Sequence, residues 1–330
     1  MDLFVISGVT GMTGNELARQ TLSAGNKVIG FDNFFASSIQ TVKDLLSNEN
    51  FIFHEYDLNN STHMQLLVKE VERLRLSCEK LIYVNCAAVV HTEHFYYINR
   101  TFQTNVLGMK MFLDQAIELG ADIYINCSTS EVYSMNSWRE GGGVSENDFL
   151  TLANAEHSQR TSYATGKLLT EFFMSDAVKQ TNRILGCSIR FANVYSKNEL
   201  YPKHIIPHII KSLKQNGEVE LLENSKVNKR TFLHNYDSCA AVLALIRSKD
   251  ALDGSVYNVG TEEEISIVDL VYLCASKLGI NNPKIIFNGY RASDPERRLL
   301  NTQKIRTRTG WNPIISLEKG IQMCVEEETK

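Results

Sequence analysis

The sequence lacks the features that mark membrane, secreted and nucleic-acid-binding proteins. No apolar stretch approaches the roughly 20 residues of a membrane helix, and the run Leu3–Ile6 is too short for a signal sequence. Lysine plus arginine (34) and aspartate plus glutamate (38) give a formal net charge of -4. With such a balanced charge, the protein as a whole does not attract a nucleic-acid backbone or an anionic membrane electrostatically. We therefore expect neither of these partners.

Cysteine is too scattered to form a disulfide framework. The seven cysteines are odd in number and contain no C-x-x-C pair, which argues against both disulfides and a zinc knuckle. A reducing, cytoplasmic location fits best. His91 and His94 lie three residues apart, but no third ligand with suitable spacing accompanies them, so we expect no metal site.

Proline is absent before Pro202, and the five prolines all lie in the last part of the chain. Before them, continuous apolar runs alternate with helical patterns, as strands buried on both faces of a parallel sheet require. These runs cover residues 3–6, 27–31, 50–54, 80–84, 122–126 and 187–191. The pattern predicts an α/β fold with a doubly wound parallel Rossmann sheet and a smaller mixed α/β C-terminal domain. The expected boundaries are 1–192 plus about 230–257 for the first domain, and about 193–229 plus 258–330 for the second.

A glycine-rich turn follows the first expected strand. Gly8, Gly11 and Gly14 are spaced G-x-x-G-x-x-G, with Met12 and Thr13 between the last two. Glycines at such a turn let the backbone approach a pyrophosphate at the N-terminus of the next helix. The spacing differs from the common G-x-G-x-x-G, and a purely structural turn is the alternative.

Polar and small residues stand at the ends of the following strands. Asp32, before Asn33, ends the second strand, where a carboxylate accepts hydrogen bonds from ribose hydroxyls and repels a 2'-phosphate; this favours NAD over NADP. Asp57-Leu58 and Ala87-Ala88 end the next two strands. They are expected to lie at the same sheet edge.

Two further groups of residues are candidates for catalysis. Thr129-Ser130-Glu131 follows the fifth strand, and Tyr163 is the one tyrosine of thirteen with a lysine, Lys167, four positions on. Residues four apart share one face of a helix, although such a pair also occurs by coincidence on surfaces.

In this order the motifs resemble the extended short-chain dehydrogenase/reductases, in the NAD-dependent nucleotide-sugar epimerase/dehydratase group. Later segments agree and extend the resemblance nearly from end to end. They are Arg190-Phe191-Ala192-Asn193-Val194-Tyr195, Arg230-Thr231-Phe232-Leu233-His234, Tyr257-Asn258-Val259-Gly260 and Gly310-Trp311-Asn312-Pro313.

The resemblance implies roles for these residues. Lys167 would hold the nicotinamide ribose and lower the pKa of Tyr163, which would take a proton from a sugar hydroxyl with help from Thr129. Asn193, Arg230 and Arg291 would meet the diphosphate of a nucleotide-sugar substrate, and His91 would contact the sugar. The implied cofactor site comprises Gly8, Gly11, Met12, Thr13, Gly14, Asp32, Asn33, Asp57, Leu58, Ala87, Ala88, Asn105, Tyr163 and Lys167.

Glu131 is the residue that most informs the reaction. In this group a glutamate here resembles the base of 4,6-dehydratases, which removes the C5 proton once C4 is a ketone. The Ser130-Glu131 pair also resembles uronate decarboxylases, whereas 4-epimerases usually lack this glutamate. We expect a 4,6-dehydratase, with epimerase and decarboxylase as alternatives. A keto-sugar reductase and a non-catalytic NAD-sensing module are more remote.

Two expectations concern segments outside these motifs. The segment 134–162 is longer than is usual for the group and contains Gly141-Gly142-Gly143 beside Trp138 and Arg139; it is either a lid over the sugar or a tolerated insertion. The resemblance also implies a homodimer through the helices that contain Asn105 and Tyr163. The first of these helices has an apolar stripe, Val106, Met109, Phe112 and Leu113, which belongs either to that interface or to the core.

Overall fold

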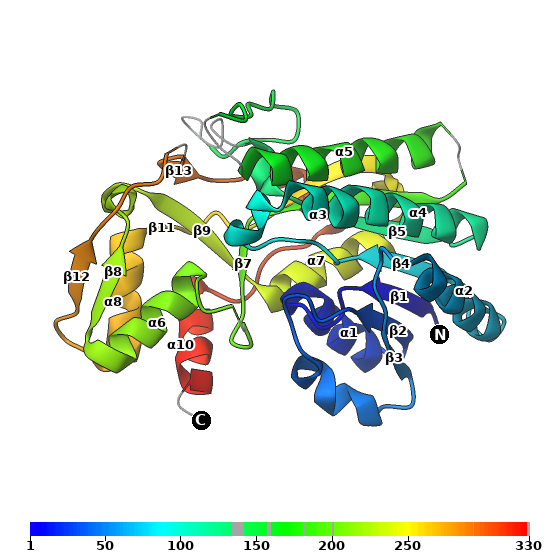
Figure 1. Ribbon diagram of the computed structural model, residues 1–330, viewed down its shortest axis with the longest axis horizontal. Coiled ribbons are helices and arrows are strands. Elements are labelled where there is room, and N and C mark those ends of the chain that lie inside the picture. Colours follow the sequence, from blue (N-terminus) through cyan, green and yellow to red (C-terminus); the bar gives the residue numbers. More distant parts are fainter. Residues whose placement is uncertain (134–141, 157–159, 181–182, 200, 293, 329–330) are drawn as a thin grey trace.

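Seven parallel strands form the central sheet of the computed structural model, in the order β10-β6-β5-β4-β1-β2-β3 (Figure 1). The structure describes residues 1–133, 142–156, 160–180, 183–199, 201–292 and 294–328. The strands are β1 (Leu3–Ser7), β2 (Lys27–Asp32), β3 (Phe51–Glu55), β4 (Leu81–Asn85), β5 (Ile123–Thr129), β6 (Leu185–Phe191) and β10 (Asp253–Val259). This confirms the predicted doubly wound Rossmann sheet.

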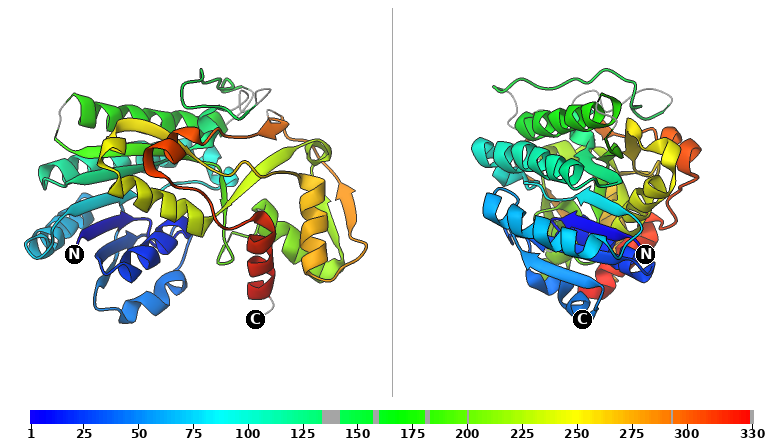
Figure 2. Two further views of the ribbon diagram at one scale, coloured as in Figure 1. Left: turned by 180° about the vertical axis from the view of Figure 1, so that it is seen from behind. Right: turned by 90° about the vertical axis from the view of Figure 1, so that its right-hand side faces the viewer.

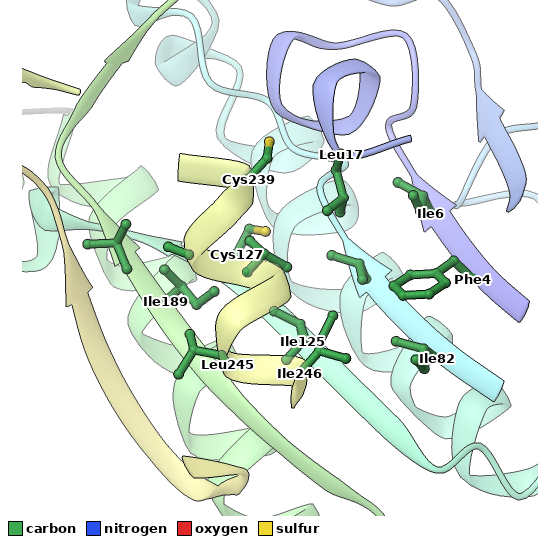
Figure 3. Packing of buried hydrophobic residues seen from close by; sticks show 14 of the residues in the cluster. Phe4, Ile6, Leu17, Ile82, Ile125, Cys127, Ile189, Cys239, Leu245 and Ile246 are labelled. Carbon is green, nitrogen blue, oxygen red and sulfur yellow. The ribbon is translucent and has the colours of Figure 1, made fainter. Parts of the chain in front are cut away.

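Helices cover both faces of this sheet because its strands are apolar on both sides. Phe4 and Ile6 pack with α1 and α7, while Leu3 and Val5 pack with α2, α4 and α5. Figure 3 shows part of the first cluster, between α7 and the strands. The helices are α1 (Met12–Ser23), α2 (Ser61–Arg75), α3 (Ile98–Phe102), the π-helical η3 (Gln103–Gly108), α4 (Met109–Glu118), α5 (Arg160–Lys179), α7 (Asn235–Arg247) and α9 (Gln303–Thr309).

A smaller part lies beyond the carboxyl ends of the central strands (Figures 1 and 2). Its sheets join β11-β9-β13, with β7 on β9, and β12-β8. Its core lies among α6, α8 and α10. The elements are β7 (Asn193–Tyr195), α6 (Ile205–Asn216), β8 (Glu218–Leu221), β9 (Lys229–His234), β11 (Glu264–Ser266), α8 (Ile267–Lys277), β12 (Lys284–Phe287), β13 (Arg297–Arg298) and α10 (Leu317–Glu328).

The chain passes between the two parts more than once. Strand β9 pairs within the small part, whereas α7 packs on the central sheet and β10 extends it. The expected domain limits, including the return at about 230–257, remain predictions. Figure 1 places the N-terminus at the far end of the large sheet and the C-terminus in the small part.

The apolar stripe of α4 belongs to the core. Val106, Met109, Phe112 and Leu113 are each at most 2% exposed. Other apolar side chains of η3, α4 and α5 face outward instead, namely Leu107, Met111, Leu169 and Phe172. The stripe is therefore part of the core and is not a dimer interface. The exposed apolar residues of these helices are different ones.

Trp138, Arg139 and Gly141 lie outside the described residues. Gly143 and Val144, which follow them, are held against the chain after β13. The Val144 N–H donates to the Leu299 carbonyl at 2.9 Å and the Asn301 N–H donates to the Val144 carbonyl at 2.9 Å. A Cβ on Gly143 would lie 2.3 Å from the Leu300 carbonyl carbon, so glycine is required for this close approach.

Candidate active site

The strand order reverses between β1 and β4, and a pocket opens at the carboxyl ends of the strands near this point. In an open α/β sheet this is where ligands bind. Every residue predicted for the cofactor lines the pocket except Asn105. Thr129 and His91 line it as well.

The glycine turn leaves room for a phosphate at the N-terminus of α1. Gly8 has a φ of +68°, and a Cβ there would lie 2.7 Å from the Ala87 backbone. A Cβ on Gly14 would lie 2.3 Å from the Gly8 carbonyl oxygen. Gly11 caps α1 without a side chain, so the first N–H groups of the helix stay available to an anion. The turn therefore fits a dinucleotide pyrophosphate.

Backbone and hydroxyl donors hold the Asp32 carboxylate at the pocket wall. It accepts hydrogen bonds from the Phe34 N–H at 2.9 Å and the Thr10 N–H at 3.3 Å. Ser37 Oγ lies 3.4 Å from the same carboxylate. Phe34 has a φ of +56°, a left-handed conformation that lets its N–H turn back to Asp32. Asp32 would hold the adenosine ribose of NAD.

The substitution Asp32→Asn is expected to lower the preference for NAD over NADP by at least about tenfold, or about 1.4 kcal/mol. The amide keeps the shape of the side chain and removes the charge that repels a 2'-phosphate. Dissociation constants of the two dinucleotides, measured by calorimetry on wild type and variant, test this. The exposed carboxylate variant Asp114→Asn is the matched control, and an unchanged preference in Asp32→Asn would contradict the role.

Further residues at this end of the pocket were not predicted from the sequence. The Arg100 guanidinium lies 3.7 Å from the centroid of the Phe35 ring, and both residues line the pocket, as Asp57 does. Asp57 accepts a hydrogen bond from Asn33 Nδ2 at 3.1 Å. Arg100 lies within the five-residue helix α3 (Ile98–Phe102), so no strand end or glycine pattern signalled it.

Thr129, Tyr163 and Lys167 all line the pocket. Lys167 Nζ donates to the Cys127 carbonyl at 2.8 Å, which directs the side chain to the end of β5. Burial lowers the pKa of Lys167, partly offset by nearby Cys127, Cys86 and Glu171. The Tyr163 ring stacks on Phe95, with centroids 4.7 Å apart.

Glu131 and Ser130 do not line this pocket. Glu131 pairs with Arg298 of β13, with its two oxygens 2.5 Å and 3.4 Å from the guanidinium nitrogens. Arg298 is 6% exposed and the Glu131 side chain 17%, so a partly buried ion pair joins the short turn after β5 to the small part. Ser130 is buried beside it.

His91 lies at the end of the pocket nearest the small part. Its ring stacks on Tyr201 with centroids 3.8 Å apart, and His204 is 5.6 Å away. Burial, followed by the neighbouring His204 and His94, lowers the pKa of His91 to about 4. The ring is therefore neutral at pH 7 and suits hydrogen bonding to a sugar hydroxyl.

Four other predicted residues lie away from the pocket lining. Asn105 bonds both backbone groups of Val89, at 2.7 Å and 3.1 Å, and so holds the loop after β4. Asn193 Nδ2 donates to the Thr231 carbonyl. Arg230 pairs with Asp294 at 3.1 Å, and the Arg291 backbone bonds the Asn224 side chain. The last three lie in the small part, and their substrate roles remain predictions.

Among the described residues no cluster of three or more histidine, cysteine, aspartate or glutamate side chains is arranged to hold a metal ion. Within the same described ranges, no helix combines the length and hydropathy needed to span a bilayer.

The doubly wound sheet places the glycine turn, the Asp32 carboxylate and the Tyr163–Lys167 pair in one pocket. This combination defines a short-chain dehydrogenase/reductase. The chain belongs to the NAD-dependent epimerase/dehydratase family, whose model matches residues 4–260. It is an NAD-dependent enzyme, as the residues predicted.

Relatives at about one quarter identity span several reactions. The low-salt glycan biosynthesis protein Agl12 of Haloferax volcanii is 26% identical over 329 residues, 99% of this chain and 98% of that protein. The dTDP-D-glucose 4,6-dehydratase of Mus musculus is 26% identical over 88% of this chain and 78% of its own. UDP-glucuronic acid decarboxylase 1 of Danio rerio is 25% identical over 98% and 71%.

Solved structures share the fold. The dTDP-glucose 4,6-dehydratase DesIV of Streptomyces venezuelae, crystallised with NAD, matches with a TM-score of 0.85 at 21% identity, covering 99% of this chain and 97% of that one. The UDP-glucose 4-epimerase of Thermotoga maritima, with UDP-glucose, matches with 0.84 at 19% identity, covering 99% and 98%. Homologues and structural neighbours are thus NAD-dependent dehydratases, decarboxylases and epimerases.

Proposed function

We propose that this enzyme is a nucleotide-sugar 4,6-dehydratase that acts through a transient 4-keto sugar. The observation that carries the proposal is the placement of Thr129 in the pocket with Tyr163 and Lys167, with Glu131 only two residues further on. Helix α5 thus supplies Tyr163 and Lys167 for proton transfer at the C4 hydroxyl. The end of β5 supplies Thr129, and the turn after it supplies the Glu131 carboxylate for the C5 proton. The glycine turn and Asp32 would hold NAD, which when bound would supply the acceptor for the C4 hydride and the donor for its return to C6.

In this proposal, side chains of the enzyme carry out the proton transfers. The Tyr163 phenolate, stabilised by the buried Lys167 ammonium, takes the proton of the C4 hydroxyl and becomes a neutral phenol. The C4 ketone then acidifies the C5 proton. The Glu131 carboxylate removes this proton and passes it to the 6-hydroxyl, which leaves as water. Arg298 places a positive charge against the Glu131 carboxylate. Movement of the Glu131 side chain from Arg298 toward the sugar is part of this proposal.

A specific observation also favours uronate decarboxylation as a second candidate. Arg298 is buried, and in the part of the chain that the structure describes its Nε has no hydrogen-bond partner. A buried guanidinium with a free donor suits a carboxylate. If the substrate were a hexuronate, its C6 carboxylate would meet Arg298, and the 4-ketone would make it a β-keto acid that loses carbon dioxide.

Proton NMR in deuterated water distinguishes these reactions. The enzyme is mixed separately with UDP-, dTDP-, GDP- and CDP-hexoses and hexuronates, without added NAD. We expect a new 6-methyl signal with solvent deuterium at C5. In Glu131→Gln the same signal should form about 10² to 10⁴ times more slowly, the range for loss of an acid–base group.

Other products would overturn the dehydratase. Carbon dioxide release from a hexuronate would establish the decarboxylase, and inversion at C4 without deuterium would establish an epimerase. Net consumption of a reduced cofactor would indicate a reductase. Full dehydratase turnover by Glu131→Gln would remove Glu131 from its role as the base.

We further propose that the substrate is a nucleotide-diphosphate sugar and that the enzyme is a cytoplasmic homodimer. Exposed Leu107, Met111, Leu169 and Phe172 on η3, α4 and α5 support pairing of these helices between two copies. The seven cysteines are free thiols, which suits a reducing compartment.

A further inference from the structure

Two cysteines lie side by side in the wall of the cofactor pocket. Cys86 follows β4 and Cys127 lies in the adjacent parallel strand β5, whose register pairs Asn85 with Asn126. Their sulfur atoms are 3.8 Å apart, and both residues line the pocket. We propose that Cys86 and Cys127 form an oxidation site in which peroxide converts the two thiols to a disulfide, and that bound NAD protects them.

The backbone geometry allows this bond. Neighbouring strands lie about 4.8 Å apart, within the roughly 4.4–6.8 Å that separates the Cα atoms of a disulfide. A rotation of the two side chains toward each other closes the gap between the sulfur atoms. Because the residues are opposite each other, no change in strand register is required.

The two thiols differ in their surroundings, which assigns an order to the reaction. The hydrogen bond from Cys86 lowers the pKa of Cys127 and outweighs its burial, and the Lys167 ammonium acts in the same direction. The bond to Cys127 and burial raise the pKa of Cys86. Lys167 Nζ is also held at the Cys127 carbonyl, 2.8 Å away, so its charge lies beside Cys127. We therefore assign Cys127 as the attacking thiolate and Cys86 as the thiol that resolves the intermediate.

The chemistry balances with a peroxide as the oxidant. The Cys127 thiolate attacks one peroxide oxygen, the O–O bond breaks, and with one proton the other oxygen leaves as water or an alcohol. The resulting sulfenic acid is attacked by the Cys86 sulfur, which forms the S–S bond, breaks the S–O bond and releases water. Two thiols lose two electrons, and the peroxide is reduced.

Nearby thiols are less suited to this reaction. Cys239 lies in the same buried cluster as Cys127 (Figure 3), but its thiol donates to the Thr13 carbonyl at 3.3 Å. Burial raises the pKa of both Cys239 and Cys187, and neither residue lines the pocket. Cys86 and Cys127 therefore differ from the other two thiols in two ways: they are accessible from the pocket, and their sulfur atoms lie close to each other.

The test is peroxide treatment of the full-length enzyme followed by peptide mapping under non-reducing conditions. We expect a cross-linked species that joins the Cys86 and Cys127 peptides and lacks two hydrogens, reversed by dithiothreitol. NAD at about 100 times its Kd leaves about 1% of the sites free, so cross-linking should slow by up to about 100-fold. Activity after treatment is compared with that of the same untreated sample.

Variants separate the pair from general oxidation. In Cys86→Ser the cross-link should vanish and a sulfenic acid at Cys127 should be trapped by dimedone. The matched control Cys78→Ser removes a half-buried thiol outside the pocket and should cross-link like wild type. Mapping of the wild type does not depend on the folding of any variant. Absence of the 86–127 cross-link, or an equal rate with and without NAD, would overturn the proposal.

Discussion

The substitution Tyr163→Phe is expected to lower kcat by about 10³-fold, within the range for loss of a general acid–base group. The change removes one oxygen atom and leaves the ring. Stacking on Phe95, with centroids 4.7 Å apart, should therefore persist. Lys167 keeps its bond to the Cys127 carbonyl, so the pocket should remain in place while the proton from the sugar hydroxyl loses its acceptor.

Single-turnover kinetics with the nucleotide sugar identified by NMR measures this effect. The affinity for NAD, determined separately, should change by less than about threefold, because the phenol contributes at most one hydrogen bond there. Tyr272→Phe, which removes a phenol from an exposed tyrosine, is the matched control. A Tyr163→Phe variant within tenfold of wild-type kcat would refute the assigned proton transfer.

The substitution Glu171→Ala is expected to reduce the free energy of unfolding by about 3–5 kcal/mol, the usual cost of leaving one member of a buried ion pair alone. Glu171 and Arg190 have side chains 5% and 6% exposed and lie 2.6 Å apart. Burial disfavours the charged guanidinium, but the hydrogen bonds and charge of Glu171 outweigh it and raise the pKa of Arg190.

The pair also fixes helix α5 against the sheet. Glu171 accepts a hydrogen bond from Ser128 Oγ at 2.5 Å, and Arg190 donates to the Tyr133 hydroxyl at 2.8 Å. Tyr163, Lys167 and Glu171 follow one another at intervals of four on α5, so they share a face of this helix. Loss of Glu171 therefore loosens the face that carries the predicted proton-transfer residues.

Urea unfolding at pH 7 tests the stability of this variant. The double variant Glu171→Leu/Arg190→Met should recover most of the loss, since apolar replacement of both partners removes the unpaired charge. Asp114→Ala breaks an exposed pair with Lys110 and should cost at most about 1 kcal/mol. A loss of under 1 kcal/mol in Glu171→Ala would show that the network is not a major source of stability.

The central sheet was predictable because its signal is local. Six of the seven strands overlap the apolar runs predicted from the sequence, whereas β10 (Asp253–Val259) was not among them. The glycine turn and Asp32 stand at strand ends. Parallel strands bring these ends to one edge. The small part was predicted only as a mixed region, since short strands such as β7 and β13 have three and two residues and carry no usable periodicity.

The sequence by itself determined the Rossmann sheet, the cofactor loop and the spacing of Tyr163 and Lys167, because these depend on contiguous residues. The tertiary structure alone decided three other features. It brought Arg298 to Glu131 across 167 positions, placed Cys86 beside Cys127 across 41, and paired Glu171 with Arg190. Each depends on how separate strands and helices pack, and side chains that meet through packing leave no periodic pattern along the chain.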